Sequence, residues 1–278
     1  MFRTRLISGI VLLLIILITL TGGGWLLWLS LLIYSLVGMF ELYRVLGFEK
    51  TPLGYAGYGG AVLMYLTLGL GLRWINPFGL DLPFAVCIAL IAGLFLFVLQ
   101  YPKYPAYQLF GMVFGAIYIP FALSYIFQIR ENLLFGKYLV WMVYAASWGS
   151  DTCAYCAGML LGKHKLAPVL SPKKSIEGSV GGILGSAILG LLVGMLMSHF
   201  AKTPPHLLPL FAIIGGCGSV ISQIGDLAAS GIKRNYDIKD YGKLIPGHGG
   251  ILDRFDSVII TAPIIYYLCV FLLRGHVI

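Results

Sequence analysis

Residues 230–256 read SGIKRNYDIKDYGKLIPGHGGILDRFD and join the end of one apolar segment to the start of another. The stretch holds five Lys or Arg residues, one His, four Asp and a glycine-rich PGHGG turn. Because charge at a membrane edge costs solvation free energy, its concentration in one loop requires a function. The pattern indicates a site that handles phosphate groups and a divalent metal.

The composition around this stretch is that of an integral membrane protein. Of the 278 residues, 59% are hydrophobic and 11% are charged, whereas a soluble globular domain carries about 25% charged residues. Apolar segments long enough to cross roughly 30 Å of hydrocarbon as helices recur along the whole chain. We therefore predict an all-α polytopic membrane protein with about nine transmembrane helices. The predicted spans are residues 6–20, 25–40, 55–72, 82–99, 107–128, 138–161, 176–198, 207–231 and 255–273.

The distribution of Lys and Arg predicts the orientation. With a cytoplasmic N-terminus, the loops on the inner side hold fourteen of the 19 Lys and Arg residues, which is the usual bias of membrane proteins. An odd number of spans then places the C-terminus outside, and the polar loops 162–175 and 232–254 face the cytoplasm. The net charge of +8 is spread over short loops, which indicates contacts with anionic headgroups rather than nucleic acid. We predict a multi-pass protein of the cell membrane with a cytoplasmic active site.

The two parts of the chain differ in the chemistry they offer. Residues 1–135 form the first five predicted spans, and we expect them to be a scaffold. Glu41 and Arg44 lie three residues apart near a helix end and are expected to pair with each other. Residues 136–278 carry every motif that indicates chemistry, so we expect the catalytic region there.

A first polar stripe lies on the predicted span 138–161. Tyr144, Ser147, Asp151 and Tyr155 follow at helical spacing and share one face. Asp151 lies about 18 Å from Lys163 along a helix, well inside the bilayer. An ionisable group at that depth is a functional candidate, although a structural hydrogen bond or ion pair between helices is the alternative.

A second stripe and the start of the last span supply three more carboxylates. Asp226 follows Ser219 and Gln223 on one helix face, and a lone carboxylate there costs several kcal/mol unless a cation or proton neutralises it. Asp253 and Asp256 are three residues apart in the first turn of the last span, beside a helix N-terminus suited to phosphate. Together the three Asp residues form a plausible all-oxygen site for Mg²⁺. The alternative is that Asp253 and Asp256 cap this helix and pair with basic neighbours.

Other residues near these carboxylates have two interpretations each. His248 is either an acid/base or phosphate donor, or a turn residue that contacts headgroups. Lys173 and Lys174 either signal orientation or neutralise a triphosphate beside the metal. A ridge of small residues predicts close helix packing in the seventh span. Its members are Gly178, Gly182, Ser186, Gly190 and Gly194.

The polar stretch contains one long motif, Ser230-x-Ile-Lys-Arg-x₄-Lys239-Asp240-x-Gly242-x₂-Ile245-Pro-x-His248-Gly-Gly-x₂-Asp253-Arg254-Phe-Asp256. Three further segments accompany it: Ser150-Asp151-Thr152, Ser171–Gly178 and Gly225-Asp226-Leu227. With these segments the chain resembles the phosphatidate cytidylyltransferases, also called CDP-diacylglycerol synthases. The matches lie between residues 150 and 257, and the first 135 residues resemble the family only in being apolar and helical.

The resemblance implies transfer of CMP from CTP to phosphatidate, which yields CDP-diacylglycerol and pyrophosphate in phospholipid biosynthesis. It also implies dependence on Mg²⁺, with K⁺ as an optional second cation, and a homodimeric multi-helix membrane enzyme whose partners are CTP, phosphatidate and membrane lipids. Two positions depart from the family pattern: Ala229 stands where an acidic residue is common, and Tyr241 where Ser is common. Neither position is one of the core carboxylates.

Carried onto this sequence, the resemblance implies a set of site residues. Asp226, Asp253 and Asp256 are the implied metal ligands. The implied catalytic residues are these three with Lys233 and His248. The implied substrate-binding residues are Ser171, Lys173, Lys174, Arg234, Lys239, Arg254 and Asp151.

Other functions are compatible with parts of this pattern. A polyprenol-type lipid kinase would share small-residue helices and Lys/Asp loops, whereas a CDP-alcohol phosphotransferase would show a D-G-x-x-A-R run that this sequence lacks. A cation-coupled transporter would also place Asp151 and Asp226 in the membrane. The concentration of charged motifs on one predicted side favours an enzyme over a transporter or a scaffold.

Overall fold

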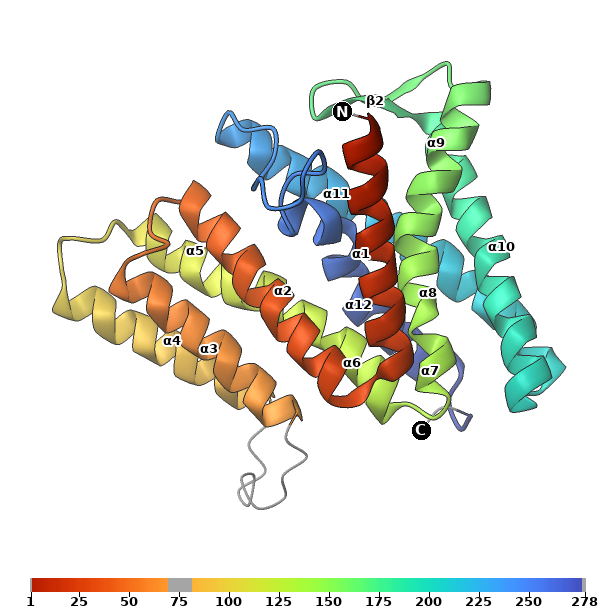
Figure 1. Cartoon of the computed structure of the whole chain (residues 1–278), viewed down its shortest axis with the longest axis horizontal. Coiled ribbons are helices and arrows are strands. Elements are labelled where there is room, and N and C mark those ends of the chain that lie inside the picture. Colours follow the sequence, from red (N-terminus) through yellow and green to blue (C-terminus); the bar gives the residue numbers. More distant parts are fainter. Residues whose placement is uncertain (1, 70–81, 277–278) are drawn as a thin grey trace. The chain divides into compact units, whose positions relative to one another are not determined.

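A computed structural model gives the fold of the chain (Figure 1). The structure describes residues 2–69 and 82–276, with side chains from residue 6 onward. Residues 70–72 of the third predicted span and Arg73 therefore lie outside the described residues. Helices make up most of the described chain, and the strands found there are β1 (Lys165–Ala167) and β2 (Ser171–Ser175), which pair antiparallel. The predicted all-α class is confirmed.

The helices coincide with the predicted spans. Within the described residues, each predicted span overlaps one helix or one run of consecutive helices. The first part of the chain forms α1 (Phe2–Gly22), α2 (Gly24–Val45), α3 (Pro52–Gly69), α4 (Leu82–Leu99), α5 (Ala106–Ala116), η1 (Ile117–Phe121) and α6 (Ala122–Asn132). The rest forms α7 (Gly136–Leu139), α8 (Trp141–Tyr144), η2 (Ala145–Gly149), α9 (Ser150–Leu161), α10 (Ile176–Ala201), η3 (Pro205–Leu207), α11 (Leu208–Asn235) and α12 (Leu252–Leu272).

The length and composition of these helices are those of a multi-pass membrane protein. In the described part of the chain, six helical segments are long and apolar enough to cross a membrane. They are Gly24–Val45, Leu82–Leu99, Ala106–Asn132, Ile176–Ala201, Pro205–Asn235 and Leu252–Leu272. Leu6–Gly22 is a shorter apolar helix. The total of nine crossings and the sides of the two termini stay predictions.

Two of the predicted spans contain a π-helical segment. In Ile117–Phe121, Pro120 has no N–H to donate, and its ring prevents the regular α-helical ladder. The second segment, Ala145–Gly149, lies directly before Ser150 and Asp151. Such local widenings of a helix often occur at functional sites, and this one contains Ser147 of the polar stripe predicted on the sixth span.

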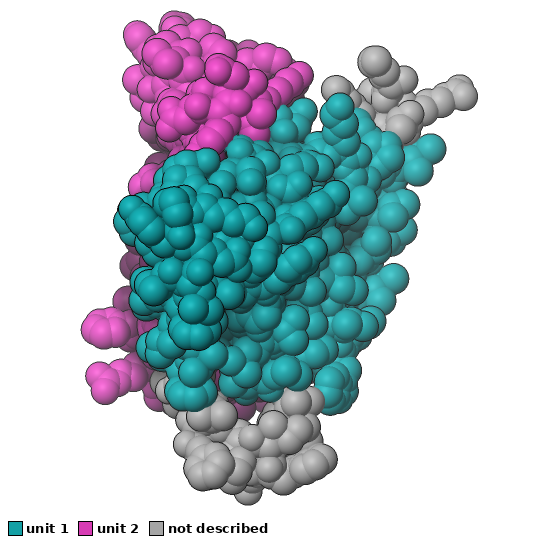
Figure 2. All heavy atoms as spheres, turned by 90° about the vertical axis from the view of Figure 1, so that its left-hand side faces the viewer, with its two compact units in different colours: residues 1–124, 240–254 teal, residues 125–239, 255–278 magenta. Residues whose placement is uncertain are grey.

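The chain forms two compact units, which have different colours in Figure 2. Unit 1 comprises residues 1–124 and 240–254, and unit 2 comprises residues 125–239 and 255–278. The segment 240–254, which carries the PGHGG turn, therefore belongs to the same unit as α1–α5. Asp253 belongs to unit 1, whereas Asp226 and Asp256 belong to unit 2.

The core of unit 1 is built around a buried tyrosine. Tyr43 of α2 donates a hydrogen bond of 2.9 Å from its hydroxyl to the carbonyl of Met112 in α5. Gly57 of α3 and Gly115 of α5 both face the Tyr43 ring, and a Cβ at either position would collide with it. Glycine thus allows three helices to meet at one aromatic side chain.

In unit 2 the small-residue ridge of α10 has the predicted packing role. Its five members are buried. A Cβ at Gly182 would lie 3.0–3.1 Å from atoms of Ser150 and Ala154 on α9, and one at Gly190 would collide with the Phe211 carbonyl of α11. The first turns of α10 therefore pack on α9 and the later turns on α11, as the spacing of small residues predicts.

Candidate active site

A cavity of about 380 Å³ lies in unit 2, a volume within the usual range for ligand sites. Residues of α9, α10 and α11 line it together with residues of the β1–β2 hairpin. Charged and polar side chains are concentrated in its wall, while the remaining lining is largely apolar. The polar members are Asp151, Tyr155, Lys173, Lys174, Ser175, Ser179, Gln223 and Asp226. Asp151, Lys173 and Lys174, which were predicted to bind substrate, thus lie at the same cavity as Asp226. The remaining lysine predicted for substrate binding in this unit, Lys239, is not part of its lining.

The β1–β2 hairpin brings the two lysines to this cavity. Ser175 ends β2 and caps α10, because its hydroxyl oxygen accepts a hydrogen bond of 3.1 Å from the N–H of Gly178. Glu177, in the first turn of α10, accepts a hydrogen bond of 3.0 Å from the N–H of Lys163 and lies 2.6 Å from Nδ1 of His164. Both ends of the hairpin are therefore fixed to the N-terminus of α10.

A hydrogen-bond network joins the three helices that line the cavity. The hydroxyl of Ser179 on α10 donates to Oε1 of Gln223 on α11 over 2.5 Å, and Nε2 of Gln223 donates to the carbonyl of Ser179 over 3.2 Å. The hydroxyls of Ser150 on α9 and Ser219 on α11 lie 2.7 Å apart. Ser219 and Gln223 thus hold the helices together, and the next polar residue of the stripe, Asp226, reaches the cavity.

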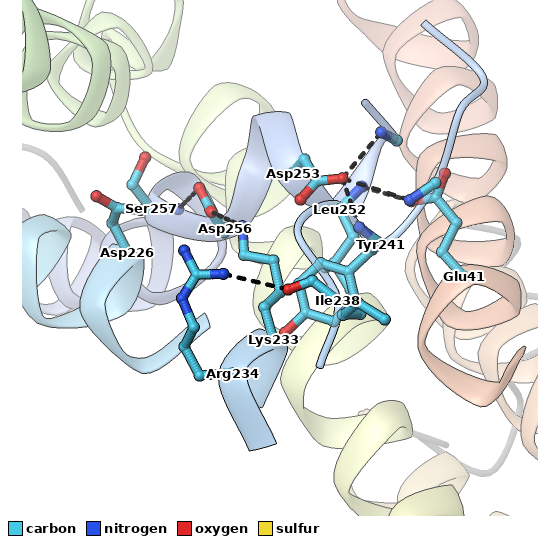
Figure 3. Close-up of polar contacts among 12 residues, drawn as sticks. Glu41, Asp226, Lys233, Arg234, Ile238, Tyr241, Leu252, Asp253, Asp256 and Ser257 are labelled. Atoms are coloured by element: carbon cyan, nitrogen blue, oxygen red, sulfur yellow. Dashed lines mark hydrogen bonds and ion pairs between the residues drawn. The ribbon is translucent and has the colours of Figure 1, made fainter. Parts of the chain in front are cut away.

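Asp226 and Asp256 each face a lysine. Lys174 of β2 forms an ion pair with Oδ2 of Asp226. Nζ of Lys233 lies 3.8 Å from Oδ2 of Asp256, whose Oδ1 accepts a hydrogen bond of 2.8 Å from the N–H of Ser257. Figure 3 shows the Lys233 and Asp256 contact between α11 and α12. Asp226 and Asp151 lie close enough to Asp256 for their charges to act on it, so three carboxyl groups gather near Lys174 and Lys233.

This donor set fits a divalent cation. Mg²⁺ prefers oxygen ligands and is usually bound by one or two carboxylates together with water and substrate phosphates. Asp226 and Asp256 come from different helices, are mutually repelling, and have ammonium groups as their counter-ions. Within residues 2–69 and 82–276, no group of three His, Cys, Asp or Glu side chains is already arranged as a metal site. A site in which Asp226 and Asp256 supply two ligands, and phosphate oxygens supply others, is consistent with this pair of carboxylates and with the lack of a preformed three-residue group in the described chain.

In unit 1, the side chain of Asp253 binds backbone N–H groups of the polar loop. Oδ2 of Asp253 accepts hydrogen bonds from the N–H groups of Tyr241, Gly242 and Gly250, over 2.8, 3.4 and 2.9 Å. The side chain is buried, with 7% exposed. None of these N–H groups belongs to α12, so Asp253 fixes the loop rather than capping the helix, and it uses only the backbone of Tyr241. The departure from the family pattern at that position therefore leaves the hydrogen bond intact.

Glu41 of α2 is a second carboxylate that holds the same loop. Its two oxygens accept hydrogen bonds from the N–H groups of Ile251, over 3.1 Å, and Leu252, over 2.8 Å, at the start of α12. Glu41 is only 3% exposed. Its negative charge lies at the positive end of the α12 dipole, which is the favourable arrangement.

Glu41 and Arg44 lie close enough for their charges to interact, as expected, but their hydrogen-bond partners lie elsewhere in the chain. Arg44 donates a hydrogen bond of 2.6 Å to the carbonyl of Tyr241. Both side chains bind the 240–254 segment, which is about 200 residues further along the chain. A buried acidic residue in an otherwise apolar span was the signal for such a role, and spacing alone gave no indication of where the partner lies.

The glycines of the loop are explained by these carboxylates. A Cβ at Gly242 or at Gly250 would collide with the carboxylate of Glu41. Gly249 has φ of 87°, in the left-handed region that favours glycine, and a Cβ there would lie 2.8 Å from Oδ2 of Asp253. The Gly-Gly pair thus permits two carboxylates to approach the backbone closely.

His248 is held by α1. The hydroxyl of Ser8 donates to the carbonyl of Pro246 over 3.0 Å and lies 2.8 Å from Nδ1 of His248. Nδ1 of His248 is therefore engaged with the Ser8 hydroxyl, and Nε2 lies on the opposite edge of the ring.

Four predicted site residues remain to be placed. Ser171 begins β2, and Lys239 is exposed near the end of unit 2. Nη1 of Arg234 donates to the carbonyl of Ile238 over 3.4 Å. Arg254 lies in the first turn of α12, where its N–H bonds the carbonyl of Ile251 over 3.0 Å. None of these four residues lines the cavity of unit 2.

These features define a class: a multi-pass helical membrane protein with a charged cavity that combines lysines and carboxylates. Residues 3–272 match the Cytidylyltransferase family, and the chain belongs to that family. It is similar to the phosphatidate cytidylyltransferases of Staphylococcus saprophyticus, at 31% identity over 96% of this chain and 99% of the relative, and of Bacillus subtilis, at 33% over 96% and 97%. The Staphylococcus epidermidis protein of the same name is 32% identical over 96% of this chain and 99% of the relative.

Proposed function

We propose that the protein is a phosphatidate cytidylyltransferase, which transfers CMP from CTP to phosphatidate and releases pyrophosphate. Family membership and likeness to enzymes of that name over nearly the whole chain support this function. The structural observation that carries it is the cavity of unit 2, where Lys173 and Lys174 lie with Asp226. Lysines can neutralise phosphates, and carboxylates can hold the metal that accompanies a nucleoside triphosphate.

The reaction requires alignment more than chemical activation. A phosphate oxygen of phosphatidate attacks the α-phosphorus of CTP, forming one P–O bond, while the bond to the β-phosphate oxygen breaks and pyrophosphate leaves with its electron pair. Both reactants are anions, so the protein must hold them in line and reduce their repulsion. Lys173 and Lys174 are positioned to neutralise phosphate oxygens at the cavity. No protein nucleophile is needed, because the attacking oxygen is already negatively charged.

Asp226 and Asp256 are the carboxylates that we propose as ligands of Mg²⁺. When bound, the ion would neutralise charge on the phosphates of CTP and on the departing pyrophosphate. Lys174 and Lys233, which pair with these carboxylates, would then turn toward phosphate oxygens. K⁺ is proposed as an additional cation from the resemblance alone. Asp151 lines the same cavity and would orient a ligand or extend the cation site.

Asp253 has a second proposed role besides the metal-ligand role predicted from the sequence. One of its oxygens binds three backbone N–H groups of the 240–254 segment. We propose that it shapes this loop, together with Glu41. His248, with Nδ1 directed at Ser8, is proposed to present Nε2 to a phosphate.

The position in the cell is proposed from the charge distribution. The lysine-rich segments 162–175 and 232–254 are expected to face the cytoplasm, where CTP is found, and the apolar helices admit lipid from the side. Residues 136–278 supply the predicted catalytic region, and a homodimer is proposed from the resemblance.

The function is tested by measuring pyrophosphate release from CTP by the purified protein with phosphatidate and Mg²⁺. We expect activity in the wild type and a loss of at least about 100-fold in Asp226→Asn, beyond the 10–100-fold typical of residues that only orient metal ligands. Asp237→Asn is the matched control, since Asp237 is exposed and has a positive φ that Asn tolerates. Transfer of a phosphoryl group from ATP to a lipid alcohol, with no reaction of CTP, would contradict the proposal and favour a lipid kinase.

A further inference from the structure

A second cavity, of about 450 Å³, lies in unit 1 and is almost wholly apolar. One wall is a face of α1, to which Ile7, Val11 and Ile15 contribute at intervals of four residues. Tyr34 of α2 and the segment Leu244–Pro246 of the polar loop complete the lining. We call this cavity the α1 groove. Ile7 and Ile15 are separated by about 12 Å along the helix axis, so the groove is elongated along α1.

One end of the α1 groove is polar. Ser8 lines the groove near Ile7, and its hydroxyl bonds the carbonyl of Pro246 and contacts Nδ1 of His248. The opposite end, at Ile15, has hydrocarbon side chains. The groove is therefore amphiphilic along its length, with the PGHGG turn at one end and an apolar pocket at the other.

The surroundings of α1 determine what can fill such a groove. Side chains on both sides of its lining are apolar and exposed, including Ile10 at 47% and Leu14 at 49%, as expected for a helix in contact with lipid. In that environment the available filler is hydrocarbon, because water gains nothing in an apolar cavity. A dry cavity of roughly 150 Å³ already accepts benzene, so the α1 groove has room for a substantial length of acyl chain.

We propose that the α1 groove binds one acyl chain of the phosphatidate substrate, with the lipid phosphate at the His248 end. This inference rests on the proposed function and adds to it the site of the lipid's tail. Phosphatidate suits the groove because its headgroup is a bare phosphate, which can reach the turn next to Ser8 without a further group in between. Burial of the chain would supply about 0.8 kcal/mol per methylene, enough to hold the lipid while its phosphate reacts.

The first test varies the length of the substrate chain. Ile15→Trp fills the far end of the groove, so only a long chain should meet the new side chain. We expect kcat/KM for dioleoyl phosphatidate to fall about tenfold or more, because tenfold corresponds to fewer than two buried methylenes. For dihexanoyl phosphatidate the change should stay below about twofold. Leu14→Trp is the control, since Leu14 is similarly exposed on the next position of α1 but does not line the groove.

Equal losses for the long and the short substrate in Ile15→Trp, or the same selectivity in Leu14→Trp, would overturn the inference while leaving the proposed function standing. A wild-type protein that transfers CMP to neither substrate would instead contradict the proposed function. The two failures are therefore distinguishable in one set of assays.

The second test does not depend on turnover. Phosphatidate and phosphatidylcholine, each with a diazirine at the end of one acyl chain, are photolysed with the protein in vesicles, and labelled peptides are identified by mass spectrometry. We expect phosphatidate to label α1 around Ile15 and unlabelled phosphatidate to compete. Equal labelling by phosphatidylcholine without competition would show that bulk lipid fills the groove, and it would overturn the inference.

Discussion

The loop of unit 1 and the charged site of unit 2 each involve two carboxylates, but the carboxylates of the two units have different partners. Glu41 and Asp253 accept hydrogen bonds from five backbone N–H groups of the 240–254 segment. Asp226 and Asp256 face the ammonium groups of Lys174 and Lys233. The first kind of partner belongs to the fold itself, whereas the second is the end of a flexible side chain.

The kind of partner indicates whether a carboxylate stabilises the fold or takes part in catalysis. A backbone N–H cannot leave its acceptor without opening the loop, and hydrogen bonds to charged groups contribute about 1.5–3 kcal/mol. A lysine ammonium is a mobile point charge that can move to a phosphate when a metal ion replaces it. We therefore expect substitutions in unit 1 to affect stability first, and substitutions in unit 2 to affect catalysis first.

The largest expected effect comes from Asp256→Asn. Removing this charge takes one proposed ligand from the metal and one of the charges that the partly exposed Lys233 faces. We expect cytidylyl transfer to fall by at least about 100-fold, with little change in the thermal unfolding midpoint. The measurement pairs pyrophosphate release with thermal unfolding in the same detergent. A variant that keeps full activity would remove Asp256 from the site.

Asp253→Asn tests whether Asp253 holds the 240–254 loop or binds the metal ion. Asn keeps an acceptor oxygen for the loop but loses the charge, so we expect the loop to loosen and activity to fall about 10–100-fold. Hydrogen–deuterium exchange at the amides of Tyr241 and Gly250 should become faster, while Asp237→Asn serves as the unaffected control. Unchanged exchange together with a large increase in the Mg²⁺ needed for activity would show instead that Asp253 is a metal ligand.

Glu41→Gln should destabilise the protein more than it impairs catalysis. The N–H groups of Ile251 and Leu252 would lose a charged acceptor at the start of α12, and we expect a loss of about 1.5–3 kcal/mol in unfolding free energy. Activity below the new unfolding midpoint should change only a few-fold. Glu49→Gln, in the turn before α3, is the control. If Glu41→Gln were as stable as the wild type, the proposed role of Glu41 in holding the loop would be wrong.

The smallest effects are expected where helix packing alone is altered. A Cβ at Gly215 of α11 would collide with the Ser186 carbonyl of α10, whereas one at Gly216 would find only ordinary contacts at 3.8 Å. Gly215→Ala should therefore cost about 1–3 kcal/mol through overpacking. Gly216→Ala should be neutral or slightly stabilising, because Ala favours the helix. Equal unfolding midpoints for the two variants would contradict the close packing of α10 on α11.

Much of the helical architecture could be read from local pattern. The apolar spans and the small-residue ridge of α10 were predicted because length, hydropathy and four-residue spacing are properties of neighbouring residues. The same spacing identified Asp226 on the polar face of α11, and the structure places it at the cavity. The hydrogen-bond partners of Glu41 were not predicted, because Ile251 and Leu252 are about 210 residues away in the sequence.

The amino-acid sequence by itself determined that this chain is a multi-pass helical protein, which segments are helices, and which polar residues are too costly in a membrane to lack a purpose. Only the tertiary structure decided the partners of those residues: backbone N–H groups for Glu41 and Asp253, and lysines for Asp226 and Asp256. The physical reason is the distance along the chain over which each interaction acts. Helix formation and hydrophobicity act between neighbours along the chain, whereas a buried charge is satisfied by whichever group the fold brings within about 3–4 Å.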